Sequence, residues 1–241
     1  MLGRSLAYVA VVTCVSAATL SIAHAQTRAV IELFTSQGCS SCPAADKLIA
    51  ELANDPTLVS MSLPIDYWDY LGWKDTLADP RNTIRQRGYS KVRADREVYT
   101  PQVVVNGTYH VLGSDRAAIE KMIAKSRQNT SALSLPVTLS VGGGRLTASF
   151  ASDGRAAEVW VVGLAKAVAV AVGRGENKGK TITYSNVARS WHKLTSTDGK
   201  TWSLPLDQID GDGVNRAAVL VQGGTSERPG LIFGAAMASI R

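Results

Sequence analysis

Two cysteines three positions apart, Cys39 and Cys42, most constrain what this chain can fold into. They follow an apolar run at residues 29–34 that is typical of a buried strand, and they precede a segment with helical spacing at residues 44–53. Backbone N–H groups in the first turn of a helix have no intrahelical partner and carry the positive end of the helix dipole, so they stabilise a thiolate. The pattern predicts a strand, a reactive cysteine pair and a helix, with Cys39 as the exposed nucleophile and Cys42 as the resolving thiol.

The N-terminus predicts export. Arg4 gives a positive start, residues 6–22 are apolar, and the Ala-His-Ala at residues 23–25 fits the small-residue pattern of a cleavage site. We therefore expect a signal peptide over residues 1–25 and a mature chain that is periplasmic or secreted. After cleavage we expect no stable membrane insertion.

Removal of this signal would leave Cys39 and Cys42 as the remaining cysteines, because Cys14 lies within it. An oxidising compartment favours a disulfide between them at rest. Closing so short a loop removes little chain entropy, so the stability gained falls at the low end of the disulfide range. This favours a redox-active pair, while a structural disulfide and a metal-binding pair stay open as alternatives.

The charge and the histidines point to no further ligand. The 241-residue chain has a net charge of +6 that is spread along it, which favours solubility and does not indicate nucleic-acid binding. The mature-chain histidines, His110 and His192, are not spaced as a second ligand pair for zinc. We therefore predict no metal site and no cofactor.

A second apolar run at residues 58–65 completes a β-α-β unit. Because crossovers between parallel strands are right-handed, the two strands should be neighbours, with the cysteine pair at the carboxyl end of the first. The aromatic segment at residues 66–75 then emerges at the same edge. Trp68 and Trp73 are candidate substrate-binding residues, and packing at the end of the core is the open alternative.

A helical segment at residues 79–87 carries three basic side chains, Arg81, Arg85 and Arg87. A solvated helix face is the simplest interpretation of such a set. Docking of an acidic or anionic partner is the alternative.

The residues Thr100 and Pro101 precede two strands that flank Asn106-Gly107, a favoured two-residue hairpin turn. A proline just before a strand in mid-sheet is anomalous unless it has a special conformation. A cis bond between Thr100 and Pro101 resolves the anomaly.

With a closing helix at residues 116–127, the element order is β-α-β-α-β-β-α. This order resembles the thioredoxin superfamily, which implies that Cys39 is the attacking thiol, Cys42 the resolving thiol and Pro101 a cis proline facing the disulfide. The resemblance also implies that the backbone beside Pro101 pairs with a bound polypeptide strand, so Thr100 is a candidate substrate-binding residue. The superfamily also holds a buried acid behind the disulfide. Glu32 stands one residue upstream of that place, so a proton-transfer role and an inward glutamate paired with a lysine both remain open.

The amino-acid sequence around these motifs resembles that of one exported family, catalogued as domain of unknown function 1223. The residues that carry this resemblance lie at 32–46, 66–73 and 99–102, and the likeness extends over essentially the whole mature chain. It implies a thioredoxin-like half joined to a β-rich half. It supplies no established substrate or activity.

Beyond residue 130 the chain changes to short strand-like runs between Gly, Asn and Asp turns. These runs lie at residues 135–141, 146–150, 158–164, 167–172, 181–184, 191–195, 201–206, 217–222 and 231–236. Such spacing predicts an antiparallel sandwich or barrel-like arrangement. The glycine-rich segment at residues 173–179 is interpreted as a hairpin connection, because its glycines do not fit a phosphate loop and no helix follows.

The expected fold is therefore α/β, with a thioredoxin-like domain at residues 26–130 and a β-rich domain at residues 131–241. The leading hypothesis is an exported thiol–disulfide oxidoreductase that exchanges disulfides with a protein or small-molecule thiol partner through Cys39 and Cys42. The sequence identifies neither its electron donor nor its acceptor. The alternative is a redox-inert binding or assembly module whose cysteines form a structural disulfide or bind a metal.

Overall fold

The computed structural model describes residues 26–194 and 200–241, so the predicted signal peptide lies outside the described residues. The helices are α1 (Cys42–Leu52), α2 (Pro80–Arg93) and α3 (Arg116–Ser126), with short 3-10 turns η1 (Asp69–Leu71) and η2 (Leu206–Gln208). The strands are β1 (Ala29–Thr35), β2 (Leu58–Pro64), β3 (Gln102–Val105), β4 (Tyr109–Leu112), β5 (Thr138–Gly142), β6 (Arg145–Ser149), β7 (Glu158–Ala171), β8 (Thr181–Leu194), β9 (Thr201–Pro205), β10 (Val214–Thr225) and β11 (Arg228–Ser239).

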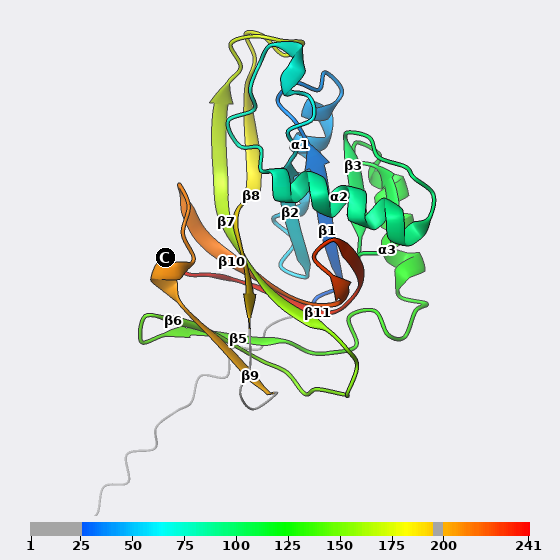
Figure 1. Cartoon of the computed structure of the whole chain (residues 1–241), viewed down its shortest axis with the longest axis vertical. Helices are drawn as coiled ribbons and strands as arrows, with labels where there is room; N and C mark the ends of the chain where they lie inside the picture. The colour runs from blue at the N-terminus through cyan, green and yellow to red at the C-terminus, as the bar shows by residue number, and fades with distance from the viewer. Residues whose placement is uncertain (1–25, 195–199) are drawn as a thin grey trace, which may run out of the picture.

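Most of the strands form one mixed sheet in the order β11-β10-β7-β8-β2-β1-β3-β4, and the other three form the antiparallel sheet β5-β6-β9 (Figure 1). Within the first part of the chain, β1 is parallel to β2 and antiparallel to β3, which in turn is antiparallel to β4. Together with the helices this gives the predicted order β-α-β-α-β-β-α. The predicted α/β class is confirmed.

Strand β1 is buried along its whole length, because helices cover both faces of the sheet around it. Successive side chains of a strand point to opposite faces. Ile31 and Leu33 pack against α1 and α3, whereas Phe34 packs on the side of α2. By the same alternation, Glu32 faces α2 and Thr35 faces α1.

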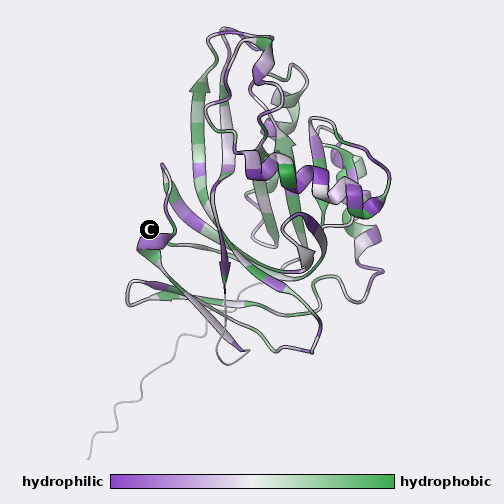
Figure 2. Cartoon of the chain, viewed as in Figure 1, coloured by the Kyte–Doolittle hydropathy of each residue, from purple (hydrophilic) through white to green (hydrophobic). Residues whose placement is uncertain are grey.

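Helix α2 begins at a well-formed cap. The Asp79 carboxylate accepts a hydrogen bond from the Arg81 backbone N–H at 2.8 Å, and Pro80 occupies the first turn, where its missing N–H breaks no helical bond. The helix runs to Arg93, beyond the predicted end at residue 87, and stops where Ala94 adopts a left-handed φ of 59°. Figure 2 shows α2 with mixed hydropathy and the central strands as mostly hydrophobic.

The long strands β7 and β8 replace four short strands that the sequence pattern predicted at residues 158–164, 167–172, 181–184 and 191–195. Each is continuous over 14 residues. The polar stretch around Asn186 is no turn, because the ladder continues through a register shift between Gly163 and Leu164. Asn186 adopts a left-handed φ of 48°, and its side chain donates to the Ser60 carbonyl at 2.9 Å.

Strand β8 joins the two parts of the chain. It lies parallel to β2 at Ser62 and Val187, and the Ser62 hydroxyl donates to the Ser185 carbonyl at 2.8 Å. Strands from both sides of residue 130 therefore share one sheet. The division into two domains at that residue stays a prediction.

The three-stranded sheet packs one face over the end of the large sheet formed by β7, β10 and β11, as Figure 1 shows in its lower half. Leu146 and Trp202 meet Val219 in this second core. The packing of one antiparallel face on another is sandwich-like. In the described part of the chain, no helix is long and apolar enough to cross a membrane.

Candidate functional site

Cys39 and Cys42 lie between the end of β1 and the first turn of α1. Their sulfur atoms are 2.13 Å apart, which is disulfide distance. Cys42 is the first residue of α1, and Pro43 follows it in the first turn. The pair therefore stands at a helix N-terminus, as the sequence indicates.

The prediction that Cys39 is exposed is wrong. Only 3% of its surface is accessible, and Cys42 is fully buried. The exposed residues of the motif are Ser40 and Ser41, and the Ser41 hydroxyl lies 3.5 Å from the Cys39 sulfur. A distant part of the chain contacts the backbone of Cys39, and the motif alone could not show this.

The connection between β7 and β8, residues 172–180, contacts the backbone around Cys39 and is called here the hairpin loop (Figure 1, top). Asn177 is fully buried, and its side-chain nitrogen donates to the carbonyls of Gln37 at 3.0 Å and Cys39 at 2.8 Å. The Glu176 carboxylate accepts a hydrogen bond from the Ser40 N–H at 3.1 Å. These contacts clamp the cysteine loop, residues 36–42, from a position 138 residues further along the chain.

Trp68 connects the cysteine loop to the segment before β3. Its indole N–H donates to the Thr100 hydroxyl at 2.7 Å. A Cβ added to Gly38 would lie 3.1 Å from the Cβ of Trp68, so the tryptophan packs directly on the residue before Cys39. The structure therefore brings the predicted residues Trp68 and Thr100 to the cysteine pair.

Trp73 connects the cysteine loop to the hairpin loop. Its indole N–H donates to the Gln37 side-chain oxygen at 2.8 Å. Its ring lies so close to Gly173 that a Cβ added there would be 2.8 Å from the nearest ring carbon. Trp73 thus packs between the two loops, and its predicted role in substrate binding stays a prediction.

The Thr100–Pro101 peptide bond is cis, as the sequence indicates. A Cβ built on Gly113 would lie 3.2 Å from the Cβ atoms of both Ala45 and Pro101, so the proline lies near the first turns of α1. This is the side of the sheet that carries the cysteine pair.

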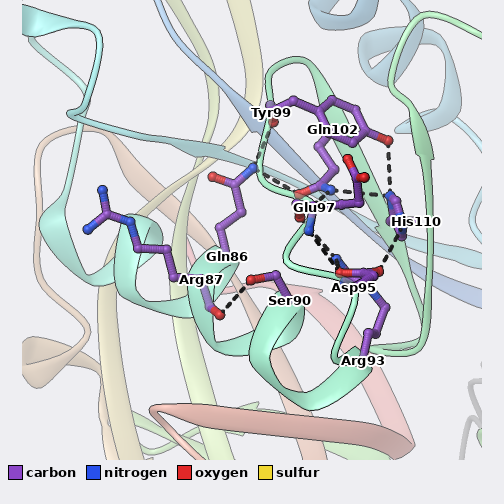
Figure 3. A network of polar contacts seen from close by, with 9 residues as sticks. All are labelled: Gln86, Arg87, Ser90, Arg93, Asp95, Glu97, Tyr99, Gln102 and His110. Carbon is purple, nitrogen blue, oxygen red and sulfur yellow. Dashed lines mark hydrogen bonds and ion pairs between the residues drawn. The ribbon is translucent and has the colours of Figure 1, made fainter.

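A polar network holds the segment that leads to Pro101 (Figure 3). Gln86 of α2 donates to the Tyr99 carbonyl at 2.8 Å, and the Tyr99 hydroxyl lies 3.0 Å from Nδ1 of His110. Nε2 of His110 lies 3.2 Å from the Asp95 carboxylate. Burial lowers the pKa of His110, so the ring is mainly neutral at pH 7. The network fixes the backbone just before the cis proline.

Glu32 lies on the other side of the sheet. Nε of Arg85 donates to its carboxylate at 2.6 Å, and the Tyr89 hydroxyl donates to the second carboxylate oxygen. Arg85 is 5% exposed, so the prediction that this arginine belongs to a solvated face is wrong. Glu32 points inward and is paired with a cation, which is one of the two alternatives that the sequence left open. Its partner is an arginine, where a lysine was expected. Its role in proton transfer stays untested.

A buried acid on the side of α1 was missed at the sequence level. Asp46 follows Cys42 by one helical turn on the same face and is fully buried. The Thr35 hydroxyl donates to its Oδ1 at 2.7 Å, and Oδ2 has no partner in the part of the chain that the structure describes. Burial raises the pKa of Asp46 to about 8, so the carboxyl is mostly protonated at pH 7. The four-residue spacing from Cys42 was the available signal.

Two further polar groups are buried around Asp46. Tyr184 of β8 has a hydroxyl without a partner among the described residues, and burial raises its pKa, with Asp46 and Asp75 adding to the effect. Burial also raises the pKa of Asp75, whose carboxylate accepts from the Gln37 N–H at 2.7 Å and so anchors the cysteine loop. This interior excludes water and favours an uncharged acid.

No metal-binding cluster is evident in residues 26–194 and 200–241, where no three His, Cys, Asp or Glu side chains converge on one point. Cys39 and Cys42 would supply two thiolate ligands if reduced.

The fold has relatives among solved structures. The crystal structure of protein AGR_C_4864 from Agrobacterium tumefaciens is 32% identical in sequence with a TM-score of 0.80, over 91% of this chain and 97% of that chain. HBP35 of Porphyromonas gingivalis is 14% identical with a TM-score of 0.59, over 89% of this chain and 76% of that chain, which shows a similar fold alone. No curated protein matches the sequence. The model of the family described as protein of unknown function (DUF1223) matches residues 30–222, and the chain belongs to that family.

Proposed function

We propose that this protein is an exported thiol–disulfide oxidoreductase that exchanges disulfides with a protein or small-molecule thiol. The observation that carries the proposal is the cysteine pair at the N-terminus of α1 with the protonated acid Asp46 one turn behind Cys42. A buried carboxyl with an unpaired oxygen costs stability, and such costs are concentrated at functional sites. A purely structural disulfide has no need of such a group. The thioredoxin-like order of elements and the predicted signal peptide support the same assignment.

The chemistry follows from the two cysteines. A partner thiolate attacks the Cys39 sulfur, the bond from Cys39 to Cys42 breaks, and Cys42 leaves as a thiolate that takes the proton of Asp46. A second thiolate of the partner then attacks the mixed disulfide and releases Cys39 as a thiolate. The partner is oxidised by two electrons and the cysteine pair is reduced. In the reverse direction the Asp46 carboxylate takes the proton of Cys42, and the reduction potentials decide which direction prevails.

Cys39→Ala should abolish dithiothreitol-coupled reduction of insulin, because no mixed disulfide can form without the attacking sulfur. Turnover is followed by the turbidity of the insulin chains. Ser40→Ala is a matched control, since Ser40 is an exposed residue of the same loop and should retain wild-type turnover. Equal rates for wild type and Cys39→Ala would contradict the proposal.

The 3% exposure of Cys39 favours a second candidate, a redox-inert binding or assembly module whose disulfide is structural. A redox titration distinguishes the two. Structural disulfides have potentials below about −300 mV, whereas redox-active pairs are more easily reduced. A midpoint below that value, without insulin turnover, would support the second candidate.

Asn177→Ala should speed the reduction of the disulfide by tris(2-carboxyethyl)phosphine about tenfold or more, if the attack on Cys39 requires the hairpin loop to open. The substitution removes two hydrogen bonds to loop carbonyls, each worth about 1 kcal/mol, so the open state becomes more populated. Trapping of the released thiols measures the rate.

Asn82→Ala is the matched control for this experiment. Asn82 is also fully buried and donates to a backbone carbonyl, that of Pro64 at 2.9 Å, but it belongs to α2. A faster reduction in both variants would point to global unfolding. An unchanged rate in Asn177→Ala would show that the hairpin loop does not limit access.

A further inference from the structure

We propose that a pocket beside α2 binds a small planar molecule that carries a carbonyl or carboxylate oxygen at one edge. The pocket has a volume of about 270 Å³ and is called here the tryptophan pocket. Its lining comes from one face of α2, from Trp160 of β7 and Trp191 of β8, and from Ser226 and Glu227 in the turn between β10 and β11. None of these residues belongs to the cysteine loop or contacts it, so the proposal does not rest on the proposed redox function.

Apolar side chains form the walls of the tryptophan pocket. The rings of Trp160 and Trp191 meet edge to face, with centroids 6.4 Å apart at 74°. Ile84 of α2 completes the wall and is 50% exposed. A flat ring laid against these side chains would bury apolar surface that the free protein leaves in contact with water.

Arg85 gives the pocket one fixed hydrogen-bond donor. Its Nε donates to Glu32, and its Nη2 donates to Tyr89 at 2.7 Å and to Gln222 at 2.9 Å. Among the described residues none accepts from Nη1, and this nitrogen retains contact with solvent although the residue is only 5% exposed. Since Arg85 lines the pocket, Nη1 is the donor that a ligand can reach.

The guanidinium group cannot turn away to find another partner. Its central carbon lies 5.0 Å from the Tyr89 ring centroid and 4.7 Å from that of Trp191, so aromatic rings hold its plane. An unpaired donor in an apolar pocket favours a ligand with an acceptor at the matching place, and the bond is strengthened by the charge on the donor.

Charge and size narrow the ligand further. Arg85 is already paired with Glu32, and Arg81 at the rim is paired with Asp79. A neutral carbonyl oxygen is therefore sufficient. A carboxylate could bond to Arg85 but would meet the exposed Glu227 of the lining, and a cation could approach Glu227 but would meet Arg85. The volume falls just below the range of about 300–1,000 Å³ that is typical of drug-sized ligands, so one ring or two fused rings would fit.

Titration calorimetry with three naphthalenes tests the proposal on the full protein. We expect saturable 1:1 binding of 2-naphthoate and 2-naphthamide, and at least tenfold weaker binding of 2-(aminomethyl)naphthalene, which lacks the acceptor and is a cation. The ratio of the dissociation constants of naphthoate and naphthamide shows whether a negative charge on the acceptor strengthens binding. Absence of saturable binding up to millimolar concentration, or equal binding of all three compounds, would overturn the proposal.

Two variants of α2 locate the binding. Ile84→Asp places a charge in the wall and should weaken naphthoate binding at least tenfold, whereas Val92→Asp, an equally drastic change at a side chain that is 43% exposed on the same helix, should leave it unchanged. Cys39→Ala should bind as the wild type does. Equal affinity of Ile84→Asp and wild type would refute the assignment. Self-association that Ile84→Asp abolishes, without ligand binding, would assign the pocket to a second copy instead.

Discussion

Asp46→Asn is expected to raise the free energy of unfolding by about 4 kcal/mol at pH 7. Burial raises the pKa of Asp46 in the folded protein from 3.8 to about 8. The folded state therefore binds more protons than the unfolded state between these values, so the wild type is most stable below pH 3.8 and loses stability as the pH rises to about 8. Each pKa unit corresponds to about 1.4 kcal/mol, and asparagine does not ionise. Denaturant unfolding at pH 4, 7 and 8.5 measures the effect.

The same variant should lose redox activity although it gains stability. Without the proton of Asp46, the Cys42 thiolate is a poorer leaving group, and general acids contribute factors of about 10² to 10⁴ to a rate. The wild-type rate should also change with pH near the pKa of Asp46, about 8, and this step should be absent in the variant. Thr35→Val is the control, because it removes the hydrogen bond to Oδ1 but keeps the carboxyl. A stability difference that is equal at pH 4 and pH 8.5 would contradict the raised pKa.

Local sequence signals were sufficient to predict the cysteine pair and the cis proline at the centre of the site. The spacing of Cys39 and Cys42 at a strand–helix junction requires only neighbouring residues, and Pro101 before a strand implies its own conformation. Both features, and the order of elements up to residue 126, are present in the structure. The exposure of Cys39 could not be predicted in this way. It depends on Asn177 and on the pairing that places β7 and β8 beside β2.

A shift of one residue along a strand decides whether a buried acid lies on the face of the sheet that carries the disulfide, as Glu32 and Asp46 show. Glu32 is one position upstream of the expected place, and a shift of one residue moves a side chain to the opposite face of a strand. It therefore meets Arg85 of α2 instead of the disulfide. Asp46 lies on the same face of α1 as Cys42, where a helix brings residues four apart together. The helical spacing from Cys42 identifies Asp46, whereas the strand pattern does not.

The sequence predicted that the part of the chain after residue 130 consists of β-strands, but it did not predict how long these strands are or how they pair. The polar stretch around Asn186 in the middle of β8 has the composition of a turn. The structure keeps it inside a long strand, with a left-handed conformation at Asn186 and a register shift in the pairing with β7. The partner of Asn186 lies on β2, more than 100 residues away, as its contact with Ser60 shows. No local pattern contains that information.

Arg85→Met is expected to lower the free energy of unfolding by about 3–5 kcal/mol. The substitution keeps most of the side-chain volume but leaves Glu32, which is fully buried, without its cation, and removing one member of a buried ion pair has this typical cost. Tyr89 and Gln222 lose hydrogen bonds as well. Denaturant unfolding at pH 7 measures the loss.

The double variant Glu32→Leu, Arg85→Met should recover most of this stability, because it removes the buried charge together with its partner. The Gln222 side-chain nitrogen still donates to the Tyr89 hydroxyl at 2.9 Å, but the Tyr89 hydroxyl proton and Gln222 Oε1 lose Glu32 and Arg85, so the recovery stays incomplete. Arg81→Met is the matched control: Arg81 lies on the same helix and is also paired with an aspartate, but its side chain is 52% exposed, so the cost should stay below about 1 kcal/mol. If the double variant is as unstable as the sum of its single substitutions, Glu32 and Arg85 stabilise the fold independently, and the pairing between β1 and α2 does not depend on their charges.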